Sequence, residues 1–206
     1  REVAWYDPDH VRTRGILGFQ QSGDRWVTPF EARMIKTKHV WHNRFGWLPQ
    51  EYVARYERGE RRFGARWIQA ERENSIPQNF AHAWEVETDH FLVKTNVSLE
   101  KGVEIASKLE DYNGWFRRAF PEFFNSPEVL KQLFSGGSRR VAKRVPFEVH
   151  FYRTHDEYMK KLGKENPQLS ITNGIDMPDH RVAYFYDNAE TSTESTLYHE
   201  ATHQIL

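Results

Sequence analysis

The chain has 206 residues, of which 38% are hydrophobic and 15% aromatic, and this composition indicates a folded protein with a buried core and excludes general disorder. The 29 Lys and Arg residues balance the 29 Asp and Glu residues, and zero net charge argues against a nucleic-acid partner, which requires a basic face. The absence of cysteine excludes disulfides and Cys-ligated zinc, and no apolar stretch is long enough to be a membrane segment.

Residues 1–80 are rich in Trp, Arg and Gly and contain a faint internal repeat. Residues 23–27 (GDRWV) recur as residues 64–68 (GARWI), and residues 46–48 (GWL) are a weaker copy between them. Each copy predicts a short β segment after a Gly turn. We predict an accessory or spacer region, in which the Trp side chains either pack internally or form a ligand-binding surface.

Two short helices are predicted within this region. Residues 28–31 (TPFE) form a capping box with Pro at the first helical position, so a helix should run to about Lys36. A second helix should begin at Pro49 and end at Gly59.

Residues 81–206 carry longer elements and are predicted to form a second domain. In chain order we expect a strand at 91–97, a helix from Ser98 to Pro121, a strand at 147–151, a helix at 155–162, a loop at 163–181, a strand at 182–186 and a helix from about Ser192. This order predicts an α+β fold in which helices pack against a sheet.

The last predicted helix carries the sequence His-Glu-Ala-Thr-His at residues 199–203, above a predicted buried stripe of Leu197, Ala201 and Ile205. Because four residues advance a helix by about 400°, His199 and His203 should lie one turn apart on nearly one face. Two imidazole nitrogens in that arrangement can bind one Zn²⁺, while Glu200 projects to the side as a general base.

Elimination narrows the class of zinc site. Leu206 stands where a metzincin needs Gly, and a site of the peptide deformylase type needs a Cys ligand that the chain lacks. The gluzincin type remains, in which a Glu or, less often, an Asp on a following helix is the third ligand.

Residues 197–204 (LYHEATHQ) resemble the active helix of an uncharacterised bacterial family assigned to the gluzincin peptidases of the zincin superfamily. In that family the motif reads His-Glu-Ala-Thr-His-Gln, and Gly-x-Trp segments often lie upstream. The resemblance covers residues 84–206 and, more loosely, 1–80. It implies a zincin-like mixed sheet over the active helix, a zinc cofactor, a peptide or protein substrate, and a site of action outside the cytoplasm.

The family's third ligand, a Glu beyond the second His, has no counterpart before Leu206, and the chain begins at Arg1 without a Met or signal peptide. We therefore expect a piece of a longer polypeptide, truncated after the active helix. Two imidazoles alone should hold zinc poorly, so this piece should be inactive by itself.

Candidate substrate-binding residues precede the active helix. In gluzincins the preceding strand often lies at the sheet edge and pairs with the substrate, so residues 182–186 are either that edge strand or an ordinary core strand. Tyr184, Tyr186 and His180 are candidates to stabilise the tetrahedral oxyanion.

The sequence leaves three functions open. They are a zinc-dependent peptidase, a catalytically inactive peptidase-like binding module that uses the Trp-rich region, and a zinc amidase acting on a cell-wall link. The compartment and the oligomeric state are not assigned by the sequence.

Overall fold

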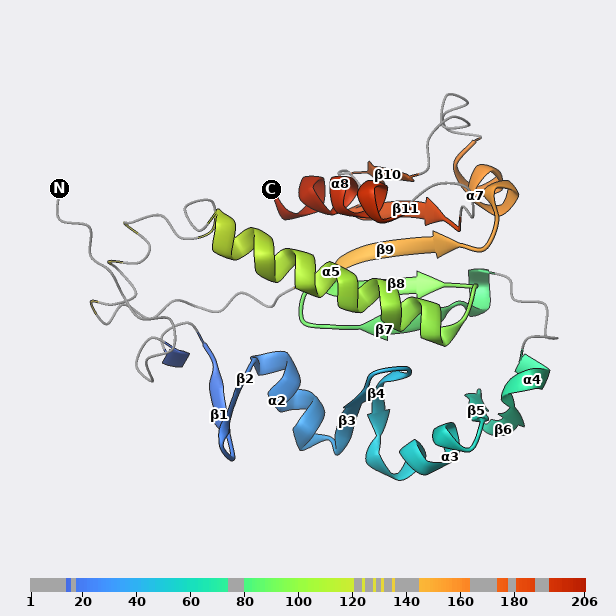
Figure 1. Cartoon of the computed structure of the whole chain (residues 1–206), viewed down its shortest axis with the longest axis horizontal. Helices are drawn as coiled ribbons and strands as arrows, with labels where there is room; N and C mark the ends of the chain where they lie inside the picture. Colours follow the sequence, from blue (N-terminus) through green and yellow to red (C-terminus); the bar gives the residue numbers. More distant parts are fainter. Residues whose placement is uncertain are drawn as a thin grey trace.

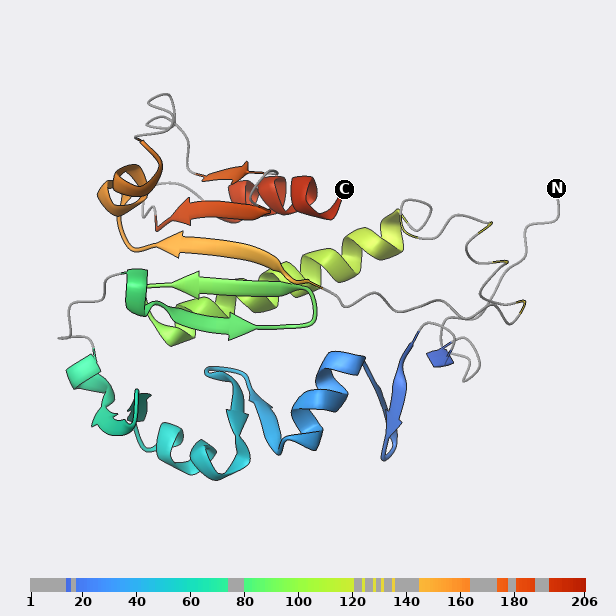
Figure 2. The same cartoon turned by 180° about the vertical axis from the view of Figure 1, so that it is seen from behind.

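The computed structural model of the chain describes residues 14–15, 18–73, 80–120, 124, 128, 131, 135, 145–163, 174–177, 181–187 and 193–206. These parts form a mixed α+β structure, in which short hairpins and helices are followed by a five-stranded mixed sheet (Figures 1 and 2). Within the described ranges, no helix is both long and apolar enough to cross a membrane.

The Trp- and Gly-rich region consists of three consecutive units, each a β-hairpin followed by a helix. The hairpins pair β1 (Gln20–Ser22) with β2 (Arg25–Val27), β3 (His39–His42) with β4 (Gly46–Pro49), and β5 (Glu60–Phe63) with β6 (Arg66–Gln69). Gly23, Gly46 and Gly64 have φ values of 60°, 71° and 57°, which a residue with a side chain rarely adopts. The β segments predicted after the Gly turns are confirmed, and the weaker copy at residues 46–48 belongs to a complete unit.

The helices of these units begin close to the predicted positions. Helix α2 spans Pro29–Lys36. Its capping box is formed by the Thr28 N–H donating to Glu31 Oε2 at 2.9 Å and the Glu31 N–H donating to Thr28 Oγ1 at 3.1 Å. The second helix starts with the 3₁₀ turn η1 (Gln50–Tyr52) and continues as α3 (Val53–Glu57), whereas α4 (Ala70–Glu73) was not predicted.

Aromatic side chains join each unit to the next. Phe30 of α2 packs edge-on against Trp47 of the second hairpin, with ring centroids 6.1 Å apart, and Tyr52 packs against Trp67 of the third hairpin at 5.0 Å. Trp41 and Trp47 face each other across the second hairpin at 5.8 Å. These contacts favour internal packing over ligand binding for Trp47 and Trp67.

The main sheet has the strand order β10-β11-β9-β8-β7. Its strands are β7 (Trp84–Glu87), β8 (Phe91–Thr95), β9 (Phe147–Tyr152), β10 (Gly174–Met177) and β11 (Val182–Tyr186). The three predicted strands β8, β9 and β11 are parallel and central, and β7 and β10 are antiparallel edge strands. The prediction of a loop over 163–181 was wrong at β10, because this short strand obtains its hydrogen bonds from a neighbour that follows it in the chain.

Helices cover both faces of the sheet. α5 (Leu99–Ala119, capped by Ser98) and α8 (Thr193–Ile205) pack on one face, and α7 (His155–Leu162, capped by Thr154) packs on the other. Side chains from alternate strand positions separate accordingly: Phe151 and Phe185 join the core beneath α5 and α8, whereas Tyr152 and Tyr184 join the cluster beneath α7.

The hairpin units lie along strand β7 and the first turn of α5, below the sheet in Figure 1. Phe45 is only 3% exposed and belongs to the same core as the sheet and α5. Arg61 donates from Nη2 to Glu100 Oε1 of α5 at 2.7 Å. The two regions therefore share a core and are joined by an ion pair between Arg61 and Glu100.

Candidate metal centre

Helix α8 is held against the sheet and against α5. Tyr198 stacks on Tyr112 of α5 with ring centroids 4.8 Å apart, and the Tyr112 hydroxyl lies 2.6 Å from Thr202 Oγ1. These contacts fix which side of the helix faces outward. The predicted buried stripe is confirmed, with 2%, 1% and 8% exposure for Leu197, Ala201 and Ile205.

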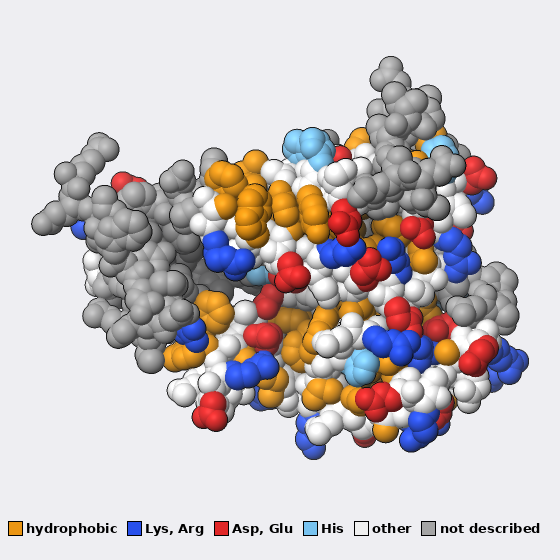
Figure 3. Space-filling view, in the orientation of Figure 1, with side chains coloured by type: hydrophobic (Ala, Val, Ile, Leu, Met, Phe, Trp, Pro, Cys, Tyr) orange, Lys and Arg blue, Asp and Glu red, His pale blue; other side chains and the backbone are white. Residues whose placement is uncertain are grey.

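His199 and His203 lie together on the outer side of α8. Both side chains are exposed, and Figure 3 shows histidine at the surface above this helix. Their Nε2 atoms are 3.3 Å apart, within hydrogen-bond distance of each other, and their ring planes are inclined by 80°. Two nitrogens bound at about 2.0–2.1 Å to one tetrahedral zinc ion would lie roughly 3.3 Å apart. The pair therefore has the separation that a single zinc ion requires of two of its ligands.

Glu200 projects from α8 toward the sheet edge. Its Oε2 accepts a hydrogen bond of 2.8 Å from the backbone N–H of Asp176 in β10. The side chain is half-buried between the exposed histidines and this strand. The carboxylate therefore lies at the boundary between the helix surface and the edge of the sheet.

Asp176 and Gln204 complete a polar cluster beneath the histidine pair. Burial raises the pKa of Asp176, and the neighbouring Glu200 carboxylate raises it further, while His203 and Gln204 lower it. Gln204 donates from Nε2 to the Glu148 carbonyl of β9 at 3.1 Å. Asp176 was not predicted as a site residue, because its segment was predicted to be a loop. Gln204 belongs to the resembled motif but was not predicted to have a role.

The residues described by the structure provide two histidine ligands and no more complete metal site. Across these ranges, no group of three or more His, Cys, Asp or Glu side chains is placed to hold a metal ion. Catalytic zinc usually takes three protein ligands and a water molecule. The pair fits zinc in its donor type and spacing, and it is two side chains of the three that such a site requires.

The structure does not bring the predicted substrate-binding residues to the histidine pair. Tyr184 and Tyr186 lie on the face of the sheet that α7 covers, opposite α8; Tyr184 contacts His150 at 5.1 Å and Tyr186 contacts His155 at 4.9 Å between ring centroids. His180 lies outside the described residues.

Strand β11 is not at the edge of the sheet. It pairs with β10 on one side and with β9 on the other, so its backbone is not free to bind a peptide. The edge-strand alternative for residues 182–186 was wrong, and the core-strand alternative is confirmed. The edge strand beside α8 is instead β10.

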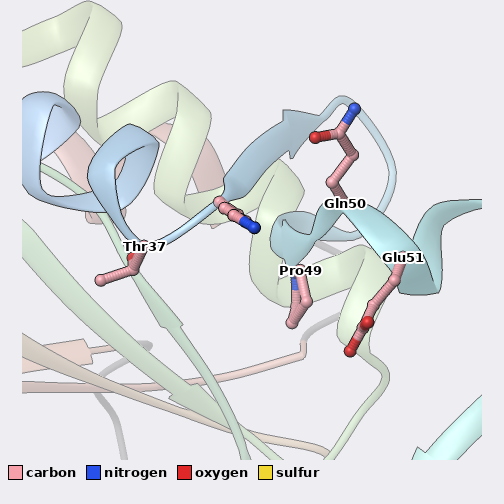
Figure 4. A pocket seen from close by; sticks show the side chains of 5 residues that line it. Thr37, Pro49, Gln50 and Glu51 are labelled. Carbon is pink, nitrogen blue, oxygen red and sulfur yellow. The ribbon is translucent and has the colours of Figure 1, made fainter.

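A surface hollow of about 450 Å³ lies elsewhere, at the base of the second hairpin (Figure 4). It is lined by Thr37, Lys38, Pro49, Gln50 and Glu51. These elements lie on the far side of the sheet unit from α8 (Figure 1), and the hollow has neither a His nor a pair of carboxylates. We assign it no chemistry.

Comparisons of the chain with family models, with curated proteins and with solved structures found no match.

Proposed function

We propose that this chain carries the zinc-binding and catalytic helix of a metal-dependent peptidase of the gluzincin type. The observation that carries the proposal is the 3.3 Å separation of the His199 and His203 Nε2 atoms, with Glu200 between them in the sequence. The position of α8, on one face of a mixed sheet and beside an antiparallel edge strand, supports a zincin-like assignment of the fold.

The two histidines and the glutamate of the motif have separate roles in this proposal. His199 and His203 would hold the ion by their Nε2 atoms, and zinc bound there would polarise the scissile carbonyl and make water more acidic. Glu200 accepts the proton of the attacking water and delivers it to the leaving amine. Its half-buried position beside β10 supports this role, because an extended peptide bound along that strand would pass close to the carboxylate.

The peptide would bind along β10 rather than β11. An edge strand has backbone N–H and C=O groups that no neighbouring strand uses, and an extended peptide can pair with them. Strand β10 is the end of the sheet and packs against α8. The Asp176 N–H is bound to Glu200, so the peptide would pair with the remaining outward backbone groups of β10.

Zinc titration of the 206-residue chain tests the first step. We expect the wild type to bind one zinc ion with the modest affinity of two imidazole ligands, and His199→Ala and His203→Ala each to weaken binding by at least 10-fold. Glu200→Gln should bind zinc as the wild type does. Equal zinc binding by the wild type and both His variants would overturn the proposal.

Hydrolysis tests the second step, in a polypeptide that carries this chain together with the expected third ligand. Glu200→Gln should lower kcat for peptide cleavage by at least 100-fold while zinc remains bound. Glu200-dependent cleavage of a cell-wall amide without cleavage of peptides would favour the amidase. No Glu200-dependent cleavage of either substrate would favour the inactive binding module.

A further inference from the structure

The contact between α8 and β10 is possible because residues on one side of the helix and of the strand are spaced at nearly the same distance. One helical turn of four residues advances about 6 Å, and two residues of a strand advance roughly 6.7 Å, so positions 196 and 200 of α8 can align with positions 174 and 176 of β10. A Cβ atom at Gly174 would lie 3.0 Å from Thr196 Cγ2 and 2.5 Å from the Phe185 ring. Glycine at 174 therefore allows the close approach that brings Glu200 to Asp176.

The N–H of Asp176 points away from the rest of the sheet. Asp176 stands opposite Ala183 of β11, but its N–H donates to Glu200 rather than to that strand. In an antiparallel pair, alternate residues direct their backbone groups to the neighbour and away from it. The Asp176 N–H is thus a donor on the free edge, and the Glu200 carboxylate occupies it.

We propose that the backbone N–H of Asp176 is the positioning group for Glu200. The proposal rests on the proposed function, in which Glu200 is the general base. A glutamate side chain has several rotatable bonds, and ordering it costs conformational entropy. A hydrogen bond from the backbone of β10 to one carboxylate oxygen already orders the Glu200 side chain. Part of its conformational entropy is therefore lost before the substrate binds.

The side chain of Asp176 does not perform this role. Its carboxylate lies close enough to that of Glu200 for the two negative charges to oppose each other, and this repulsion, with burial, raises the pKa of Asp176. The backbone N–H of the same residue, in contrast, donates a hydrogen bond of 2.8 Å to Glu200 Oε2. Substitution can therefore test the backbone N–H and the side-chain carboxylate of Asp176 separately.

Asp176→Pro removes the N–H, and Asp176→Ala keeps it while removing the carboxylate. Proline is tolerated on edge strands where the missing N–H faces outward, so both variants should fold. In the polypeptide that also carries the expected third ligand, we expect kcat for a short amide substrate to be about 10-fold lower in Asp176→Pro than in Asp176→Ala, with KM differing less than twofold, because only the proline variant also lacks the N–H. Zinc affinity should be equal in the two variants, because both lack the Asp176 carboxylate that lies near His203 and neither replaces a histidine.

Hydrogen exchange of the 206-residue chain provides a readout that does not depend on activity or zinc. The Asp176 amide should exchange at least 10-fold faster in Glu200→Ala than in the wild type. Glu200→Gln keeps a carbonyl acceptor and should preserve most of the protection. The Ile175 amide, which faces β11, is the internal reference and should not change.

Two results would overturn the positioning role: equal Asp176 exchange in the wild type and Glu200→Ala, or a wild-type kcat in Asp176→Pro. A wild type that binds no zinc would count against the proposed function alone, since the exchange measurement decides the Glu200–Asp176 contact separately.

Discussion

The hairpin units at residues 18–73 and the sheet unit at residues 84–206 are stabilised in different ways. The hairpin units contribute few deeply buried apolar side chains, namely Val27, Phe45, Leu48 and Tyr56, whereas the sheet unit contributes most of the core. The hairpin units rely on tight turns, on aromatic pairs between neighbours, and on Arg stacking such as Arg55 over Trp67 at 4.1 Å. Local contacts therefore dominate the first region and long-range packing dominates the second.

The largest difference between the two regions should appear in the free energy of unfolding that is lost when an aromatic side chain is replaced by Ala. Phe151 is 1% exposed in the core of the sheet unit, and Trp41 is 36% exposed in the second hairpin. We expect Phe151→Ala to lower the free energy of unfolding by about 3–5 kcal/mol and Trp41→Ala by about 1 kcal/mol. Urea denaturation measures both, and similar costs would mean that the hairpin units are as tightly packed as the sheet unit.

The Arg61 guanidinium and the two carboxylates beside it predict a pH-dependent stability. Arg61 is shared by Glu73 of the third unit and Glu100 of α5. Burial raises the pKa of Glu73 to about 7, while Arg61 lowers it and Glu100 raises it. The folded state therefore keeps the proton that the unfolded state loses above its ordinary pKa of 4.5, and the stability from this group should fall as pH rises from 4.5 to 7.

Glu73→Gln removes this titration. Relative to the wild type it should gain stability as pH rises from 4.5 to 8, by on the order of 2 kcal/mol, in urea denaturation at a series of pH values. Glu71→Gln changes an exposed residue of the same helix and is the matched control. If Glu73→Gln kept the pH dependence of the wild type, Glu73 would be ionised in the folded state and paired with Arg61.

The smallest effect concerns the turn glycines and tests how the second hairpin docks. Gly46 and Gly23 both have positive φ, but a Cβ at Gly46 would lie 3.3 Å from Val103 Cγ2 of α5, whereas no atom of the described residues lies within 4 Å at Gly23. Gly23→Ala should cost about 1 kcal/mol and Gly46→Ala about 2 kcal/mol in thermal unfolding. Equal costs would indicate that the second hairpin does not press against the sheet unit.

Local signals were sufficient for most of the individual elements. The capping box before α2, Ser98 before α5 and the glycines of the hairpins act over three or four residues, so their effects can be predicted without knowledge of distant partners. The four-residue spacing of His199 and His203 likewise placed both rings on one side of α8, because that relation is internal to a helix.

The partners of each element depended on the tertiary structure. Residues 182–186 predict a strand in either a central or an edge position, and only pairing with β9 and β10 places β11 inside the sheet and puts Tyr184 opposite α8. Asp176 and Glu200 are separated by 23 residues in the sequence, and they meet because β10 joins the sheet beside β11 and packs against α8. Local periodicity determines what a segment becomes, whereas contacts between distant segments determine which of its groups can meet.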